Sequence, residues 1–310
     1  MISRSKTPDE LACWVALHSA EHVGPATFHR LVRKFGSPRE VLAKASAETL
    51  QGMPGADAAL LESIVFAAIR IDYCRKLIER LNDRGVRIIA YDDADFPEPL
   101  RRLHWPPGLL YVQGEYLPAD LHSVGIVGST HASARGFRTA FRSASALARS
   151  GYTIVSGNAK GIDTAAHMGA LDGGGRTVFV LPEGILNFRR HADMPAAKLE
   201  RLGVLVSERP PEAPWETEGA LARNRITAAL SEKLLIVEAQ PDDGSMHTFG
   251  TARKLGAHAM AVLFSSDTPE GNLAAIRAGA LAVHSVAELL QQVSAGGGQS
   301  HDIQQSFDLE

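Results

Sequence analysis

The sequence predicts an α/β protein with a doubly wound parallel sheet and a small N-terminal helical domain. Between residues 121 and 293, short apolar runs alternate with segments of helical periodicity, which is typical of parallel strands covered by helices on both faces. Residues 8–70 show helical spacing of apolar side chains without β-branched alternation. The 310 residues, 45% of them hydrophobic, are sufficient for one large and one small domain.

The helical domain is expected at residues 1–72. Two of its turns stand out, because residues 22–25 (HVGP) precede a helix predicted at 26–35 and residues 52–55 (GMPG) precede one at 57–69. Each has the form of a helix-hairpin-helix turn, whose exposed N–H groups can hold a DNA phosphate without reading sequence. An alternative stays open, in which both are only tight turns of a helical bundle that contacts protein.

A proline-rich connecting segment is predicted at residues 73–120. A linking helix at 71–81 leads into it, and an apolar run at 86–91 predicts a strand. Proline lacks a backbone N–H and fixes φ, so the prolines of residues 95–107 are expected to lie outside helices and central strands. The apolar runs at 86–91 and 109–114 are candidates for further strands of the large domain's sheet.

The large domain is expected at residues 121–293. Its strands are predicted at 123–128, 152–156, 176–181, 203–207, 233–238, 258–264 and 281–284. Its helices are predicted at 133–149, 162–172, 193–201, 218–230, 246–255, 270–278 and 285–293. The tail at 294–310 begins with small residues and continues with polar ones, so it is expected to be disordered.

Two glycine turns follow the first two of these strands and predict an anion site. The first turn contains Gly128 and Ser129, and the second spans Gly157 to Gly161 with Lys160 inside it. Glycine permits φ > 0 and close backbone approach, and the carboxyl ends of parallel strands share one edge of a sheet. Backbone N–H groups, two helix starts and one ammonium are therefore expected around a single crevice.

Other polar residues are expected near the same crevice. They are Ser156, Arg223, Asn224, Arg225, Gly244 and Ser245. Arg223 and Arg225 are two residues apart on a predicted helix, so they point to different sides and only one of them can face the crevice. For either arginine, the alternatives are a phosphate ligand and a solvated surface charge.

For the histidine and the glutamates near this edge of the predicted sheet, a structural role is a better interpretation than a catalytic one. His167 lies one helical turn after Asp163 and could be an oriented base, but no nucleophile accompanies it, so a packed histidine is preferred. Three glutamates at strand ends suit acid, base or metal chemistry, but their scatter favours hydrogen-bond anchors for loop amides: Glu183, Glu208 and Glu238. No cofactor or metal is expected.

Cysteine content, net charge and hydropathy exclude several other classes of protein. Cys13 and Cys74 lack the spacing of a disulfide framework or a zinc site and are expected to be core residues. The formal net charge of −3 excludes a broadly basic nucleic-acid protein but allows a local basic groove. Neither a membrane span nor a secretory signal is supported by the sequence, so the expected location is cytoplasmic.

Several longer motifs carry a family resemblance. They are SGNAKGIDTAAHMGAL (156–171), RTVFVLPEGI (176–185), GVLVSERPP (203–211), RNRITAALSE (223–232), IVEAQPDDGSMHTFGTARKLG (236–256) and GNLAAIRAGA (271–280). In order and spacing they resemble the DNA-processing protein A family, also called DprA or Smf. The proline-rich segment and residues 8–70 resemble that family's connection and its SAM-like helical domain.

The resemblance implies an extended Rossmann-like domain in a homodimeric, non-enzymatic protein. Such a protein would bind single-stranded DNA, protect incoming DNA during natural transformation and load the RecA recombinase onto it. By the same motifs, four residues would contact the DNA backbone: Ser156, Gly157, Lys160 and Gly161. The remaining residues of the same face would be Arg223, Asn224, Arg225, Gly244 and Ser245.

The chain departs from the family pattern at three positions within residues 121–293 and once after them. Thr130 stands where the first turn usually carries arginine, and Lys160 replaces an arginine, which changes a bidentate fork into a point charge. Residues 264–267 replace a Pro-Gly turn, and no winged-helix sequence follows residue 293. We therefore expect a lower DNA affinity than is usual in the family.

Two other functions stay open. The predicted sheet also resembles nucleoside-monophosphate-processing proteins of the lysine-decarboxylase-like type, whose helix after a glycine turn bears a catalytic glutamate. Here the helix after Gly250 offers Arg253 and Lys254 instead. The other alternative is a module that senses a nucleotide in the crevice without turnover.

Overall fold

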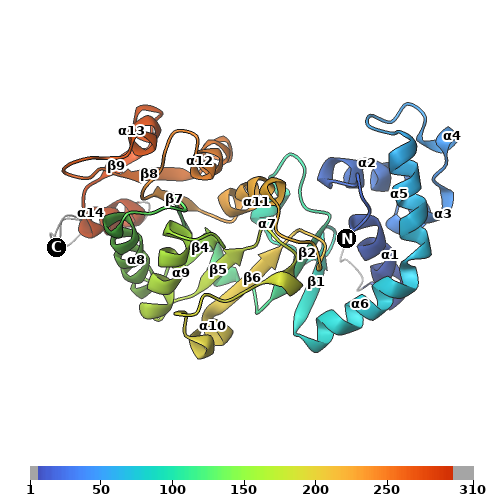
Figure 1. Ribbon diagram of the computed structural model, residues 1–310, viewed down its shortest axis with the longest axis horizontal. Helices are drawn as coiled ribbons and strands as arrows, with labels where there is room; N and C mark the ends of the chain where they lie inside the picture. The colour runs from blue at the N-terminus through green and yellow to red at the C-terminus, as the bar shows by residue number, and fades with distance from the viewer. Residues whose placement is uncertain (1–5, 296–310) are drawn as a thin grey trace. The chain divides into compact units, whose positions relative to one another are not determined.

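The structure, a computed structural model, describes residues 6–295 and forms two compact units (Figure 1). The N-terminal unit contains the chain up to Gln113, together with Gly184–Leu186 and Ser207–Ala213. The second unit contains Gly114–Glu183, Asn187–Val206 and the chain from Pro214 onward. The predicted domain boundaries at residues 72 and 120 stay predictions. The predicted tail, apart from Ser294 and Ala295, lies outside the described residues.

Six helices of the described chain build most of the N-terminal unit. They are α1 (Pro8–His18), α2 (Pro25–Phe35), α3 (Pro38–Lys44), α4 (Ala47–Leu50), α5 (Ala58–Ile69) and α6 (Ile71–Asp83). Four of them (α1, α3, α4 and α5) begin at a side-chain cap. Thr7 and Glu10 form a reciprocal capping box at the start of α1, and Asp57 accepts from the Leu60 N–H at the start of α5. Fully buried apolar side chains such as Leu17, Leu31 and Leu60 make the core.

The connecting segment contains the strand predicted at 86–91 and a second strand within 109–114. Strand β1 (Val86–Ala90) pairs antiparallel with β2 (Leu109–Gln113), so that Val86 faces Gln113. A short helix, α7 (Glu98–Arg101), lies between them although it contains Pro99. The expectation that no proline lies within a helix was wrong for Pro99, because it occupies the first turn, where a backbone N–H has no intrahelical acceptor.

Seven parallel strands form the sheet of the second unit, in the order β6-β5-β4-β3-β7-β8-β9. They are β3 (Ser123–Val127), β4 (Thr153–Gly157), β5 (Thr177–Val180), β6 (Gly203–Ser207), β7 (Lys233–Ile236), β8 (His258–Val262) and β9 (Leu281–Val283). Each strand lies within two residues of its predicted position. The predicted fold class, a doubly wound parallel sheet with an N-terminal helical domain, is confirmed.

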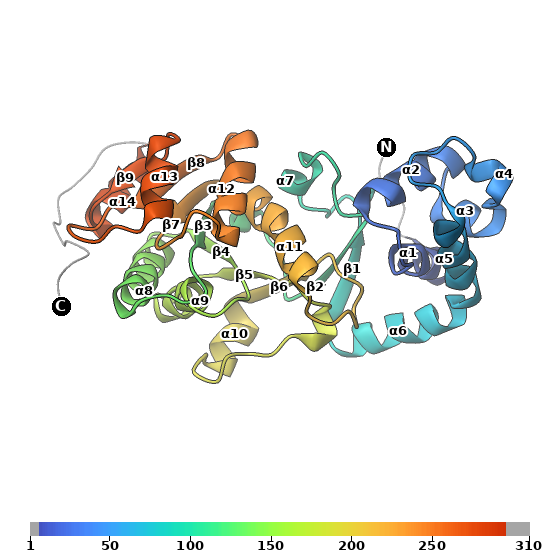
Figure 2. The same cartoon turned by 45° about the horizontal axis from the view of Figure 1, so that its top comes forward.

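Helices cover both faces of this sheet (Figure 2). The helices packed on its faces are α8 (Ala134–Arg149), α9 (Ile162–Asp172), α11 (Thr217–Ala229), α12 (Gly244–Lys254), α13 (Glu270–Arg277) and α14 (Val286–Ser294). The second unit also contains α10 (Ala196–Leu202), which buries no residue, and a 3₁₀ helix at Pro118–Leu121, whereas the 3₁₀ helix Ile185–Asn187 begins in the segment that belongs to the N-terminal unit. One buried cluster joins the sheet to α8, α9 and α14, and another joins it to α11, α12 and α13. This double cover explains why the strands are continuous apolar runs.

The strand order reverses at β3, which lies between β4 and β7. The helices that follow β3 and β4 pack on one face, whereas α12, which follows β7, packs on the other. Open sheets of this kind bind ligands at the carboxyl ends of the strands near such a reversal. Within residues 6–295 no helix is both long and apolar enough to cross a membrane.

Candidate functional site

The second predicted glycine turn connects β4 to α9 and ends in a conformation that favours glycine. Gly161 has φ 76° and ψ −123°, a combination that other residues avoid. A Cβ at Gly161 would also collide with the backbone carbonyl oxygen of Ser129. Because the Ile162 N–H donates to that same oxygen at 3.2 Å, the two predicted turns pack directly against each other.

The start of α9 carries hydrogen-bond donors that have no acceptor in the described chain. Inside the turn, the Ala159 N–H donates to Asp163 Oδ2 at 3.3 Å, and the Thr164 hydroxyl donates to the Ala159 carbonyl at 2.9 Å. The N–H groups of Lys160 and Gly161 have no acceptor among residues 6–295, where the exposed Lys160 ammonium also has no ion pair. Free N–H groups, a helix start and one ammonium together favour an anion.

The side chain of His167, on α9, forms a hydrogen bond with the backbone of this turn. Its Nε2 donates to the Gly157 carbonyl at 2.6 Å, Nδ1 lies 2.7 Å from the Thr177 hydroxyl, and the ring stacks on Phe179 at 3.6 Å. The side chain is buried, and burial lowers the pKa of His167 to about 3, so the ring is neutral. The preferred interpretation of a packed histidine is therefore confirmed.

His167 should make the protein less stable in mild acid. The folded-state pKa of about 3 lies below the ordinary value of 6.5, so protonation favours the unfolded chain as the pH falls below 6.5. From pH 7 to about pH 5, we expect this residue to remove roughly 2 kcal/mol of unfolding free energy, at 1.36 kcal/mol per pH unit. Urea unfolding at a series of pH values measures the loss.

The control for this prediction is His167→Gln, whose amide can donate to the Gly157 carbonyl but does not titrate. Its unfolding free energy should fall less between pH 7 and pH 5 than that of the natural chain. His18, whose pKa burial lowers to about 4, keeps its own contribution in both proteins. Equal losses in the two proteins would contradict the prediction.

Arg223 on α11 reaches the same turn but is buried. Its Nη2 lies 3.3 Å from Asp163 Oδ2, and a Cβ at Gly157 would collide with the guanidinium. The side chain is only 7% exposed, and its Nε has no hydrogen-bond partner within the described chain. Arg223 is thus not a solvated surface charge, and a buried donor without a partner is left for a ligand or water.

The first glycine turn is occupied by the protein's own groups. The Ser129 N–H donates to the Glu238 carbonyl at 2.6 Å, and the Ser129 hydroxyl accepts from the His131 N–H. The Glu238 carboxylate accepts from the N–H and the hydroxyl of Ser133, the N-cap of α8. A Cβ at Gly128 would lie 2.6 Å from the Glu238 carbonyl oxygen. Glu238 is therefore a hydrogen-bond anchor, as preferred from the sequence, and it holds the turn that contains Gly128 and Ser129.

The remaining predicted residues lie on α11 and at the start of α12. Asn224 Nδ2 donates to the Gly244 carbonyl at 3.1 Å and joins the two helices. Ser245 is buried, and its hydroxyl has no partner among residues 6–295. Arg225 instead lines a groove of about 360 Å³ between α11 and α12, together with His247 and Lys254. The two arginines point to different sides, as predicted.

The neighbouring polar side chains Ser156 and Asn158 form hydrogen bonds within the protein. The buried Ser156 hydroxyl donates to the Ile126 carbonyl at 2.6 Å. Asn158 Nδ2 donates to Glu183 at 3.1 Å, and burial raises the pKa of this carboxyl. Asp163 and Asn158 were not predicted as site residues, although an acid in the first turn of a helix that starts at a glycine turn is a usable signal. Among residues 6–295, no group of three potential ligands could hold a metal.

The chain matches two protein-family models and several proteins of known sequence. A family model described as DNA recombination-mediator protein A matches residues 87–294, and one described as a DprA-like N-terminal HHH domain matches residues 8–45. The Protein Smf of Synechocystis is 31% identical over 92% of this chain and 73% of its own length. The DNA processing protein DprA of Bacillus subtilis is 28% identical over 70% of this chain and 75% of its own length.

Solved structures show the same fold. The DNA processing protein A of Streptococcus pneumoniae superposes with a TM-score of 0.71 at 24% identity, covering 96% of this chain and all of that one. The protein of Helicobacter pylori, described with a single-stranded DNA binding mode, gives a TM-score of 0.59 at 23% identity. That match covers 68% of this chain and 96% of the other.

Proposed function

The chain belongs to the DNA recombination-mediator protein A family, and from that premise we propose that it binds single-stranded DNA at the start of α9. In this proposal it acts in the cytoplasm as a homodimer that protects incoming DNA in natural transformation and loads RecA. It needs no cofactor and catalyses no reaction. The single-stranded DNA binding described for the Helicobacter pylori protein supports the choice of ligand.

The observation that carries the proposal is a set of unused donors at one edge of the sheet. The N–H groups of Lys160 and Gly161 and the ammonium of the exposed Lys160 have no partner within residues 6–295. Arg223 Nε, buried against Gly157 of the same turn, also has none there. Such donors suit phosphate oxygens and carry no pattern for base edges. Binding should therefore be independent of sequence and depend on salt.

The site gives little support to catalysis. His167 is neutral and turned toward the Gly157 carbonyl, and Glu238 is held by Ser133. In α12, Arg253 and Lys254 occupy the last turn, where the nucleoside-monophosphate-processing alternative requires an acid. Release of free base from nucleoside monophosphates by the purified chain would contradict the proposal.

Lys160→Ala tests the proposed contact. We expect it to cost about 1 to 3 kcal/mol of single-strand affinity, the range for losing a charge-assisted hydrogen bond. The slope of log affinity against log salt should flatten by roughly 0.7, which corresponds to one phosphate of a single strand. Thr130→Arg, which adds a cation beside the turn, should tighten binding and steepen the slope. Fluorescence anisotropy with an oligothymidine at several salt concentrations measures both.

Lys76→Ala is the matched control, because Lys76 is an exposed lysine on α6 in the other unit. Its affinity and salt slope should equal those of the natural chain. Equal affinity of the natural chain for duplex and single strand would contradict the proposed ligand. A Lys160→Ala variant that binds single strands as tightly as the natural chain would show that Lys160 does not contact the DNA.

A further inference from the structure

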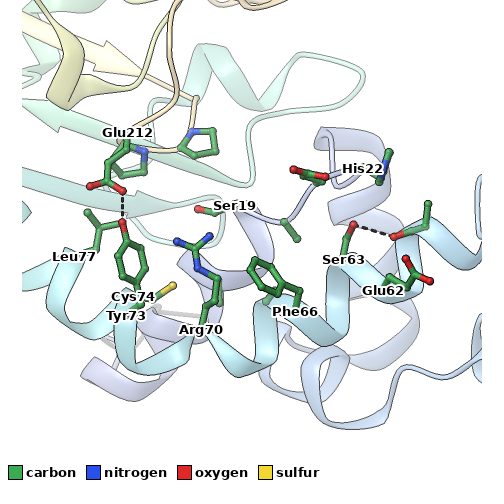
Figure 3. A pocket seen from close by; sticks show the side chains of 17 residues that line it. Ser19, His22, Glu62, Ser63, Phe66, Arg70, Tyr73, Cys74, Leu77 and Glu212 are labelled. Atoms are coloured by element: carbon green, nitrogen blue, oxygen red, sulfur yellow. Dashed lines mark hydrogen bonds between the residues drawn. The ribbon is translucent and has the colours of Figure 1, made fainter.

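A groove of about 630 Å³ opens within the N-terminal unit, whereas the proposed DNA site belongs to the second unit (Figure 3). Its walls are the end of α1 with the turn that follows, the facing sides of α5 and α6, and residues 210–212. Small and apolar side chains line much of it: Ala16, Ala20, Ala67, Leu77, Pro210 and Pro211. The volume is in the range of ligand pockets, and the lining suits an apolar body.

Arg70 stands at the centre of this groove, between α5 and α6 (Figure 3). Its guanidinium lies 4.4 Å from the centre of the Tyr73 ring and 5.5 Å from that of Phe66. Within residues 6–295 the guanidinium donates no hydrogen bond and forms no ion pair. The two rings hold the planar fork in place, and its five N–H donors remain available for a carboxylate.

The outer side of α5 adds exposed apolar surface. Val65, Phe66 and Ile69 are 50%, 60% and 75% exposed, on a helix of 12 residues. Single exposed apolar residues are ordinary, but neighbouring ones beside a groove are typical of contact surfaces. Aromatic and arginine side chains in such places contribute most of the binding energy of protein interfaces.

The carboxylates around Arg70 indicate which class of ligand the groove can bind. Glu21, Glu62 and Glu212 also line the groove, and Glu212 is already bound by the Tyr73 hydroxyl and by Arg80 at 2.9 Å. These carboxylates repel a polyanion, which argues against nucleic acid and nucleoside phosphates. A ligand with one carboxylate for Arg70 and one cation for Glu62 matches the pattern.

We propose that this groove binds an amphipathic helix of a partner protein. Glu62, Phe66 and Arg70 recur every four residues and lie along one side of the groove, which suits a helix that reads such a stripe. The bound helix places an aspartate or glutamate on Arg70 and apolar side chains on Phe66 and Ile69. A lysine or arginine about two turns away on the bound helix faces Glu62.

The test is a selection of random 16-residue peptides, displayed on phage, against the immobilised full-length chain. Enriched peptides should combine an acidic residue, apolar residues at helical spacing and a basic residue. Synthetic copies should bind at least tenfold more weakly to the Arg70→Met and Phe66→Ala chains. Binding to Arg33→Met should be unchanged, because Arg33 is an exposed arginine on α2 outside the groove.

A charge exchange sharpens the test. A peptide whose acidic residue is replaced by lysine should lose binding to the natural chain and regain it on Arg70→Glu, while melting temperatures verify that all variants fold. Single-stranded DNA affinity should be the same in every variant. Failure of enrichment, peptides without a carboxylate, or equal binding to Arg70→Met would overturn the proposal. Self-association that is lost in Phe66→Ala would also overturn it, by showing that a second copy covers the surface.

Discussion

Replacing Gly161 with alanine is expected to reduce single-strand affinity by more than tenfold and to destabilise the fold. At φ 76° and ψ −123° the new Cβ strains the backbone, and it would meet the Ser129 carbonyl oxygen, which also accepts from the Ile162 N–H. Strain in such a region costs about 1 to 3 kcal/mol, to which the collision adds. Anisotropy and urea unfolding measure the two losses.

Gly174→Ala is the matched control for Gly161→Ala. Gly174 also has positive φ, at 78°, and follows the other end of α9, but a Cβ at this position would meet no neighbouring atom within 4 Å. This variant should lose only the cost of backbone strain and keep its affinity for single strands. If both variants lost affinity equally, the contact between the two turns would not be what shapes the DNA site.

The fold was predictable because its signals are local. Buried parallel strands are continuous apolar runs, and glycine turns such as those after Val127 and Ser156 mark where the chain reverses into a helix. Even the opposed directions of Arg223 and Arg225 follow from helix geometry alone. Helix α7 was not predicted, because it requires Pro99 to fall in the first turn of a helix.

The use of each polar group at the site was harder to predict. Gly128 and Ser129 look like a phosphate turn, but Glu238, more than a hundred residues later, accepts from Ser133 at the start of α8 and fills that place. Only the pairing of β3 with β7 brings these segments together. Likewise, no local pattern shows that Asp163 pairs with Arg223, 60 residues further along the chain.

A comparable long-range anchor is Asn272, on α13, at the carboxyl ends of β7 and β8. Its Nδ2 donates to the Val237 and Val262 carbonyls, both at 2.8 Å, and its Oδ1 accepts from the Ala239 N–H at 2.9 Å. The residue is fully buried. It therefore holds the backbone beside Glu238, the residue that organises the first glycine turn.

Asn272→Asp should destabilise the chain by roughly 3 to 5 kcal/mol near pH 8, since two buried carbonyls lose their donor and face a carboxylate oxygen. Burial and those carbonyls raise the pKa of the new carboxyl above its ordinary value, so protonation restores one donor as the pH falls. The difference in unfolding free energy between the variant and the natural chain should therefore decrease as the pH falls toward about 5. Urea unfolding at both pH values measures it, with Asn82→Asp, an exposed position on α6, as control. A deficit that did not change with pH would show that the loss arises from packing rather than from the missing donor.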